Sequence, residues 1–169
     1  GKSTVAAAFA AELARRNLDK KIVLVDFAVQ FGAQAPIFGI QNQPNSVAQL
    51  AKMSLADIAN IRSQQEMLDF VQLKPVGQNA NLYLLLAPST PTELPAISME
   101  ISAEILSTLR RMFDYVVIDL PAQITNESIT AFQMSDLIFL VCEPELLSVR
   151  AARQLIQLLN DPTFAIPYD

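Results

Sequence analysis

The fold is decided by residues 1–27, GKSTVAAAFAAELARRNLDKKIVLVDF, in which a helical pattern is followed by an apolar strand. Apolar residues recur every four positions from Val5 to Leu13, which is the spacing of an amphipathic helix, and we expect this helix to end near Asn17. Residues 20–27 then consist of two lysines followed by an unbroken apolar run that ends at Asp26-Phe27. Such a run is typical of a strand that is covered on both faces.

The same alternation of helix and strand continues along the chain. Further strands are predicted over residues 81–88, 114–121 and 136–144, and helices over residues 101–111, 126–134 and 146–159. The segment between the first two strands is turn-rich, with Ser46 and Ser54 as candidate caps of short helices. This order predicts a three-layer α/β fold, with a mainly parallel sheet and helices on both of its faces.

The bulk composition indicates a globular chain. The sequence has 169 residues, of which 51% are hydrophobic, so we expect residues 1–169 to form a single domain with a sizeable core. Its apolar runs are short and separated by polar residues, which fits neither a membrane span nor disorder. We expect a cytoplasmic protein.

Charge and rare residues exclude several kinds of site. The net charge of −5 argues against nonspecific nucleic-acid binding, which needs a basic face. Cys142 is the single cysteine, so an intrachain disulfide and a cysteine-based metal cluster are excluded, and its apolar surroundings predict a packed core thiol. Since histidine is absent, any catalysis would depend on carboxylates, hydroxyls, lysines and a bound metal.

Three features should meet at one edge of the sheet. They are the start of the first helix, Asp26 after the first strand and Asp119 after the strand of residues 114–121. Ligands of parallel sheets lie beyond the carboxyl ends of the strands. Taken singly, Ser3 or Thr4 could be an ordinary helix cap, and each aspartate a turn residue. Together the three features favour a ligand site.

Gly1-Lys2-Ser3 matches the rear half of the phosphate-binding pattern G-x-x-x-x-G-K-[ST]. In that pattern backbone N–H groups and the helix N-terminus hold phosphates, lysine adds positive charge, and the hydroxyl binds Mg²⁺. Carboxylates at strand ends, such as Asp26 and Asp119, can hold such a cation together with its waters.

Several segments along the chain resemble a known family. Residues 1–14, 21–32 and 114–124 look like successive signature regions of the ParA/MinD family of deviant P-loop ATPases, and residues 119–159 are similar to one of its regions without gaps. The stretches DFAVQFG and NLYLLLAPST look most like the CpaE/TadZ pilus-assembly branch. The resemblance covers nearly the whole chain.

The resemblance implies ATP and Mg²⁺ as cofactors and assigns roles to particular residues. Lys2 would stabilise charge, Ser3 would ligate Mg²⁺, and Asp26 and Asp119 would lie near the metal through waters. The residues implied to contact the phosphates are Gly1, Lys2, Ser3 and Thr4.

Two departures from the family pattern qualify these expectations. Ala28 stands where the family usually has a second aspartate that positions water, and a methyl group cannot orient water, so we expect ATP binding with weak or slow hydrolysis. The front of the loop, with its signature lysine and preceding strand, and the later adenine loop are not in the sequence, so we expect a domain that is incomplete at both ends.

The resemblance predicts a positioning or localisation switch in pilus assembly or secretion. It implies a nucleotide-dependent homodimer when full length, contacts with pilus, secretion or polar proteins, and a place at a cell pole or the inner face of the membrane, with only indirect membrane contact. The alternative is a non-enzymatic localisation scaffold, which Ala28 favours. A nitrogenase-type iron protein on the same fold is disfavoured because its bridging cluster needs cysteines.

Overall fold

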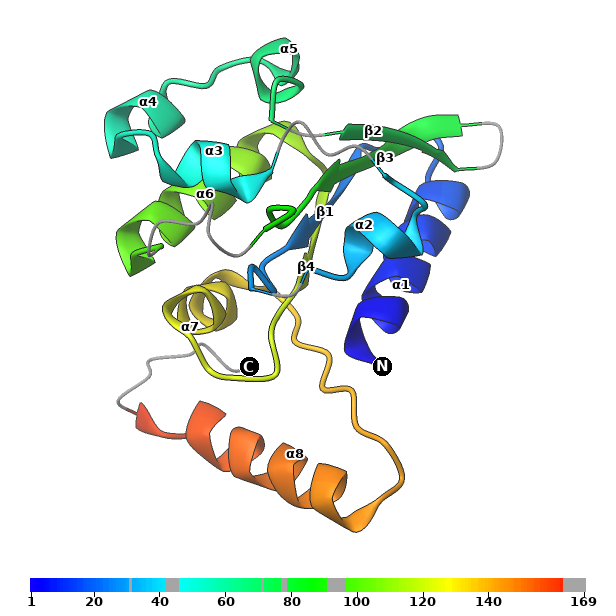
Figure 1. The fold of residues 1–169 in the computed structure, drawn as a ribbon, viewed down its shortest axis with the longest axis vertical. Helices are drawn as coiled ribbons and strands as arrows, with labels where there is room; N and C mark the ends of the chain where they lie inside the picture. The colour runs from blue at the N-terminus through cyan, green and yellow to red at the C-terminus, as the bar shows by residue number, and fades with distance from the viewer. Residues whose placement is uncertain (31, 42–45, 71, 77–78, 91–96, 163–169) are drawn as a thin grey trace.

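The computed structural model describes the chain except for residues 31, 42–45, 71, 77–78, 91–96 and 163–169 (Figure 1). Its described sheet has the strand order β2-β3-β1-β4. The strands are β1 (Ile22–Asp26), β2 (Gln72–Val76), β3 (Asn79–Leu85) and β4 (Tyr115–Asp119). Strands β3, β1 and β4 run parallel, whereas β2 is antiparallel to β3. The mainly parallel sheet is therefore as predicted, but β2 was not predicted, because its QLKPV sequence lacks an apolar run.

Helices cover both faces of the sheet, as Figure 1 shows. On one face Ile22 and Leu24 of β1 pack with alanines of α1 (Lys2–Arg16), close to α2 (Gln34–Ile37). On the other face Val23 and Val25 pack with α3, α4, α6 and α7. These helices, with the short α5, span Val47–Ala51 (α3), Leu55–Ala59 (α4), Gln64–Met67 (α5), Met99–Met112 (α6) and Asn126–Met134 (α7). The three-layer α/β architecture is confirmed.

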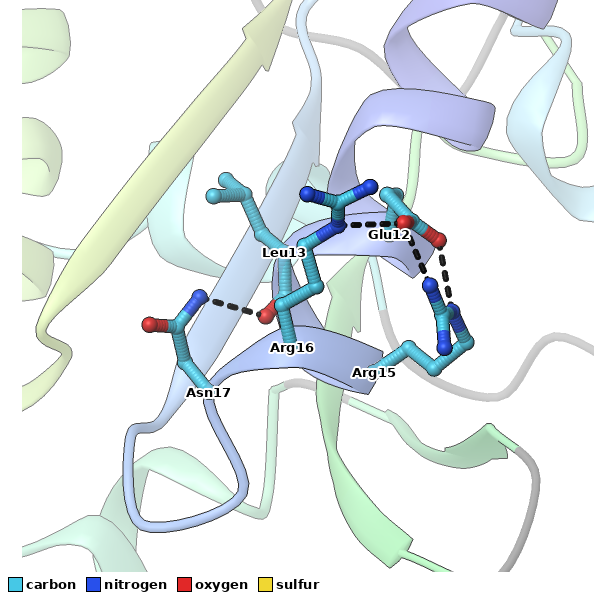
Figure 2. A network of polar contacts seen from close by, with 5 residues as sticks. All are labelled: Glu12, Leu13, Arg15, Arg16 and Asn17. Carbon is cyan, nitrogen blue, oxygen red and sulfur yellow. Dashed lines mark hydrogen bonds and ion pairs between the residues drawn. The ribbon is translucent and has the colours of Figure 1, made fainter.

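Helix ends follow the capping chemistry of the sequence. The side chains of Ser46 and Ser54 accept backbone hydrogen bonds at the starts of α3 and α4, as predicted. At the end of α1, Glu12 binds both Arg15 and Arg16, and the Asn17 amide donates to the carbonyl of Leu13 (Figure 2). Hydrogen bonds from these arginines lower the pKa of Glu12 to about 2. This cluster lies at the opposite end of α1 from Lys2.

The prediction of a strand over residues 136–144 is wrong. In the described chain this segment has no regular secondary structure, and Phe139 packs against Phe9 of α1 with ring centroids 5.1 Å apart. Strand β4 consequently borders the sheet, and Tyr115 is 40% exposed, although both faces of this strand were expected to be buried. Cys142 is exposed too, so the predicted core thiol is a surface thiol.

The final helix, α8 (Leu146–Leu159), lies below the rest of the fold in Figure 1, at the end of this extended segment. Arg150 and Arg153 on it are exposed. None of the helices in the described part of the chain is long and apolar enough to cross a membrane.

Candidate functional site

Asp26 and Asp119 end neighbouring parallel strands and are partners in register. Both residues are almost fully buried, with 1% and 2% of their surface exposed. The backbone N–H of Phe27 donates to the carbonyl of Asp119 at 2.9 Å, which ties the two strand ends together. The aspartates predicted to share one sheet edge therefore do so.

The Asp26 carboxylate organises the loop that follows it. One oxygen accepts from the backbone N–H of Ala28 at 3.1 Å, and the other accepts from those of Ala33 and Gln34, both at 3.0 Å. Gly32 allows this close wrapping, since a Cβ atom there would collide with the Cβ of Ala87 and lie 3.1 Å from the Asp26 carboxylate. Asp26 thus holds the backbone of Ala28, Ala33 and Gln34 in place.

The environment of Asp26 disfavours negative charge. Burial raises the pKa of its carboxyl to about 6, and the neighbouring Asp119 adds to the rise, while the backbone donors oppose it. A cation placed between the two strand ends would favour the ionised carboxylate. The electrostatics of this edge therefore suit a positively charged ligand.

Gln34, which was not predicted as a site residue, joins the helix start to Asp119. Its side-chain Nε2 donates to the carbonyl of Ser3 at 3.1 Å and to Oδ2 of Asp119 at 2.7 Å. The residue is fully buried, and its Oε1 has no hydrogen-bond partner among the described residues. No motif marks Gln34, because it lies in the turn-rich loop at a separation of eight residues from Asp26.

The predicted phosphate-contacting residues lie at the start of α1. Gly1 is the N-cap and makes no side-chain cap hydrogen bond, so neither Ser3 nor Thr4 is the cap. Gly1, Lys2 and Thr4 are exposed, while Ser3 is half-buried. Lys2 and Asp119 both line a cavity of about 810 Å³ between α1, β4 and residues 135–141. Backbone N–H groups in the first turn of a helix lack intrahelical partners, so they can bind an anion.

The residues at this edge fit Mg²⁺ and phosphate. The candidate metal ligands are all oxygen atoms, which Mg²⁺ prefers. They come from the side chains of Ser3, Asp26, Asp119 and Gln34, whose Oε1 is unpaired among the described residues. The described residues contain no group of three or more His, Cys, Asp or Glu that could hold a metal, so a dedicated cage is not present there. Because Asp26 already accepts three backbone hydrogen bonds, it suits contact through water better than direct ligation.

Ala28 contributes a backbone N–H to this site but has no polar side chain. It is half-buried beside Asp26. Nothing at this position can orient a water molecule through a side chain.

A family model for the AAA domain matches residues 1–163. The chain belongs to this AAA-domain family. It is 28% identical over 160 residues to the septum site-determining protein MinD of Escherichia coli K12, covering 94% of this chain and 54% of that protein. The chain thus spans about half the length of the curated relatives it matches.

Solved structures show the same fold. A ParA family ATPase from Chlorobium tepidum superposes with a TM-score of 0.78 at 22% identity, covering 92% of this chain and 61% of that one. MinD from Pyrococcus horikoshii, solved with Mg-ADP, gives a TM-score of 0.71 at 18% identity, covering 94% of this chain and 59% of that one. The predicted ParA/MinD relationship and P-loop type fold are confirmed.

Proposed function

We propose that this domain is an ATP-binding positioning switch of the ParA/MinD type. The observation that carries the proposal is the meeting of three elements at one sheet edge. Ser3 at the start of α1 and Asp119 at the end of β4 share the Gln34 amide, and Asp119 is the register partner of Asp26. The helix start and its lysine can bind the phosphates of a magnesium nucleotide, and the two buried carboxylates can bind its Mg²⁺.

Each residue has a distinct task in this proposal. Lys2 and the first-turn N–H groups of α1, at Gly1, Lys2, Ser3 and Thr4, would bind the phosphate oxygens, and the Ser3 hydroxyl would hold Mg²⁺. The Asp119 carboxylate would hold the same cation, and Asp26 would contact it through water. Mg²⁺ neutralises phosphate charge during phosphoryl transfer. Since Ala28 cannot orient water, hydrolysis is slow and the nucleotide-bound state is long-lived.

The biological role follows from the resemblance to the CpaE/TadZ branch. The whole protein would form a nucleotide-dependent homodimer and position pilus or secretion proteins at a cell pole or on the cytoplasmic face of the membrane. MinD of Escherichia coli is named for site determination in septum formation, which supports a positioning role. Direct contact with nucleic acid or lipid is not part of the proposal, in keeping with the acidic net charge of −5.

A non-enzymatic scaffold is the second candidate, and Ala28 is the observation that favours it. The two functions differ in turnover. The full-length protein should bind Mg-ATP and release phosphate slowly, and Ala28→Asp should accelerate release. A binding-competent protein in which neither form turns over would support the scaffold.

Binding itself is tested at Lys2. Lys2→Ala should weaken Mg-ATP binding by more than tenfold, corresponding to about 1.4 kcal/mol or more. Lys52→Ala is the matched control, because Lys52 is an exposed lysine at the end of α3. Equal affinity in the two variants would reject the phosphate site.

A further inference from the structure

Gln34 makes the same kind of contact with Asp119 that a cation would make. Its Nε2 carries the positive end of the amide dipole and lies 2.7 Å from Asp119 Oδ2, inside the fold. We propose that Gln34 is a positioning residue whose side-chain amide leaves Asp119 when a divalent cation binds there. Through its backbone, Gln34 would transmit this movement to the loop that Asp26 holds. This inference rests on the cation site of the proposed function.

The orientation of the Gln34 amide is determined by its neighbours. Both groups beside Nε2, the Ser3 carbonyl and the Asp119 carboxylate, are acceptors. Turning the amide over would set Oε1 against two oxygens, so Nε2 must face them. Oε1 is left buried without a partner among the described residues, which costs free energy.

Cation binding reverses this balance. A divalent ion bound to the Asp119 carboxylate would take the place of the Nε2 donor, because the amide and the ion compete for the same oxygen. The Gln34 amide would then leave Asp119, so this side chain stabilises the ligand-free site and opposes cation binding.

The backbone of Gln34 connects this exchange to Asp26. Gln34 is the first residue of α2, and its own N–H donates to Asp26 Oδ2 at 3.0 Å, beside the N–H of Ala33. One residue is thus bound to both carboxylates, by its side chain to Asp119 and by its backbone to Asp26. Movement of the amide perturbs α2 and the hydrogen bonds from Ala28, Ala33 and Gln34 to Asp26.

Asn81 provides a matched control for an ordinary buried amide. Its Nδ2 donates to the carbonyls of Ala14, Asn17 and Lys20, and its Oδ1 has no partner among the described residues. It lies in β3 just before Leu82, the register partner of Ile22, and so at the opposite end of the strands from Asp26. Asn81 shares the burial and the unpaired oxygen of Gln34, but its hydrogen bonds to the described residues go to backbone carbonyls and to no carboxylate.

The first test is nuclear magnetic resonance of the side-chain amides in the wild-type chain, titrated with MgCl₂ with and without ADP. The Gln34 signals are assigned by triple-resonance connectivities in the wild-type chain and checked by their loss in Gln34→Met, which removes the amide and keeps the length of the side chain. We expect the Gln34 amide pair to shift on Mg²⁺ addition, while the Asn81 pair stays in place. A Gln34 pair that ignores Mg²⁺ under both conditions would overturn the proposal, even if Gln34→Met fails to fold.

The second test measures cation affinity with Mn²⁺ by electron paramagnetic resonance. Because the amide competes for Asp119, Gln34→Met should bind Mn²⁺ about tenfold more tightly, the scale of a hydrogen bond to a charged group. Amide exchange at Ala28 and Ala33 should respond to the cation in the wild type and no longer in Gln34→Met. Asn81→Leu should lower stability and leave both readouts at wild-type values.

If Gln34→Met binds Mn²⁺ with unchanged or weaker affinity, Gln34 is a structural fastener and the exchange is rejected. Nucleotide binding is measured separately, with fluorescent ADP. Loss of ADP binding in the wild type, with the Mg²⁺ response intact, would count against the proposed function alone. An intact ADP site with an inert Gln34 would count against the exchange alone.

Discussion

Asp26 and Asp119 lie opposite each other in register at the ends of β1 and β4, and both carboxylates are buried. Two buried like charges oppose each other, so one of them gains from being neutral or from sharing a cation. The buried carboxylate pair therefore lowers the stability of the ligand-free fold, as unfavourable groups at functional sites commonly do.

Replacing Asp119 with Asn should separate binding from folding. The Asn oxygen can still accept from Gln34, while the like charge beside Asp26 is removed. We expect no loss of ligand-free stability in urea unfolding, together with a Mg²⁺ affinity at least about tenfold lower, since a charged oxygen ligand is lost. Retained Mg²⁺ affinity would show that the cation binds elsewhere. Asp114→Asn, at the other end of β4, controls for removal of a carboxylate.

The ligand-free protein should become less stable as pH rises through the range in which Asp26 ionises. Its folded pKa is about 6, raised from 3.8 by burial, so the folded state holds this proton more tightly than the unfolded state. The contribution is fully present below about pH 4 and is lost as the pH rises through about 6, an effect of order 1–3 kcal/mol.

Urea unfolding at several pH values, with chelator and with excess Mg²⁺, measures this dependence. Excess Mg²⁺ should flatten it, because a cation favours the ionised carboxylate. Asp26→Asn should also flatten it, since the titrating group is gone. A wild-type slope that persists unchanged in Asp26→Asn would assign the pH dependence to another group.

Gly32→Ala should loosen the loop that Asp26 holds. The added Cβ would collide with the Cβ of Ala87, so either the loop or the chain after β3 must move. Overpacking of this kind costs about 1–3 kcal/mol of unfolding free energy. The double variant Gly32→Ala/Ala87→Gly makes room for the new atom, and a thermodynamic cycle should recover most of the loss. Additive losses would place the effect in backbone conformation instead.

The sequence predicted most of the fold because local and tertiary signals agree there. The apolar runs ending at Asp26 and Asp119 and the caps Ser46 and Ser54 lead to the same elements in the structure. The meeting of the α1 start with both aspartates also followed from strand direction alone. Gln34 could not be predicted, because its role depends on a loop conformation set by Asp26 and Gly32.

Residues 136–144 do not form the strand that their sequence pattern predicts. Their apolar composition predicts a strand, but Phe139 packs on Phe9 rather than extending the sheet. Both Leu137 and Phe139 remain more than half exposed. Strand propensity reflects packing against neighbours, so an apolar run without a paired strand need not form one.

Cys142 gives a direct measure of this segment in solution. It is exposed in the structure and is the single cysteine of the chain. A disulfide reagent such as Ellman's should therefore label one thiol per chain under native conditions, at a rate close to that in denaturant, because reactivity follows access to the thiolate. A thiol buried in a sheet would instead react only after local unfolding, slower by orders of magnitude. Slow labelling that becomes fast in denaturant would show that residues 136–144 join the edge of β4.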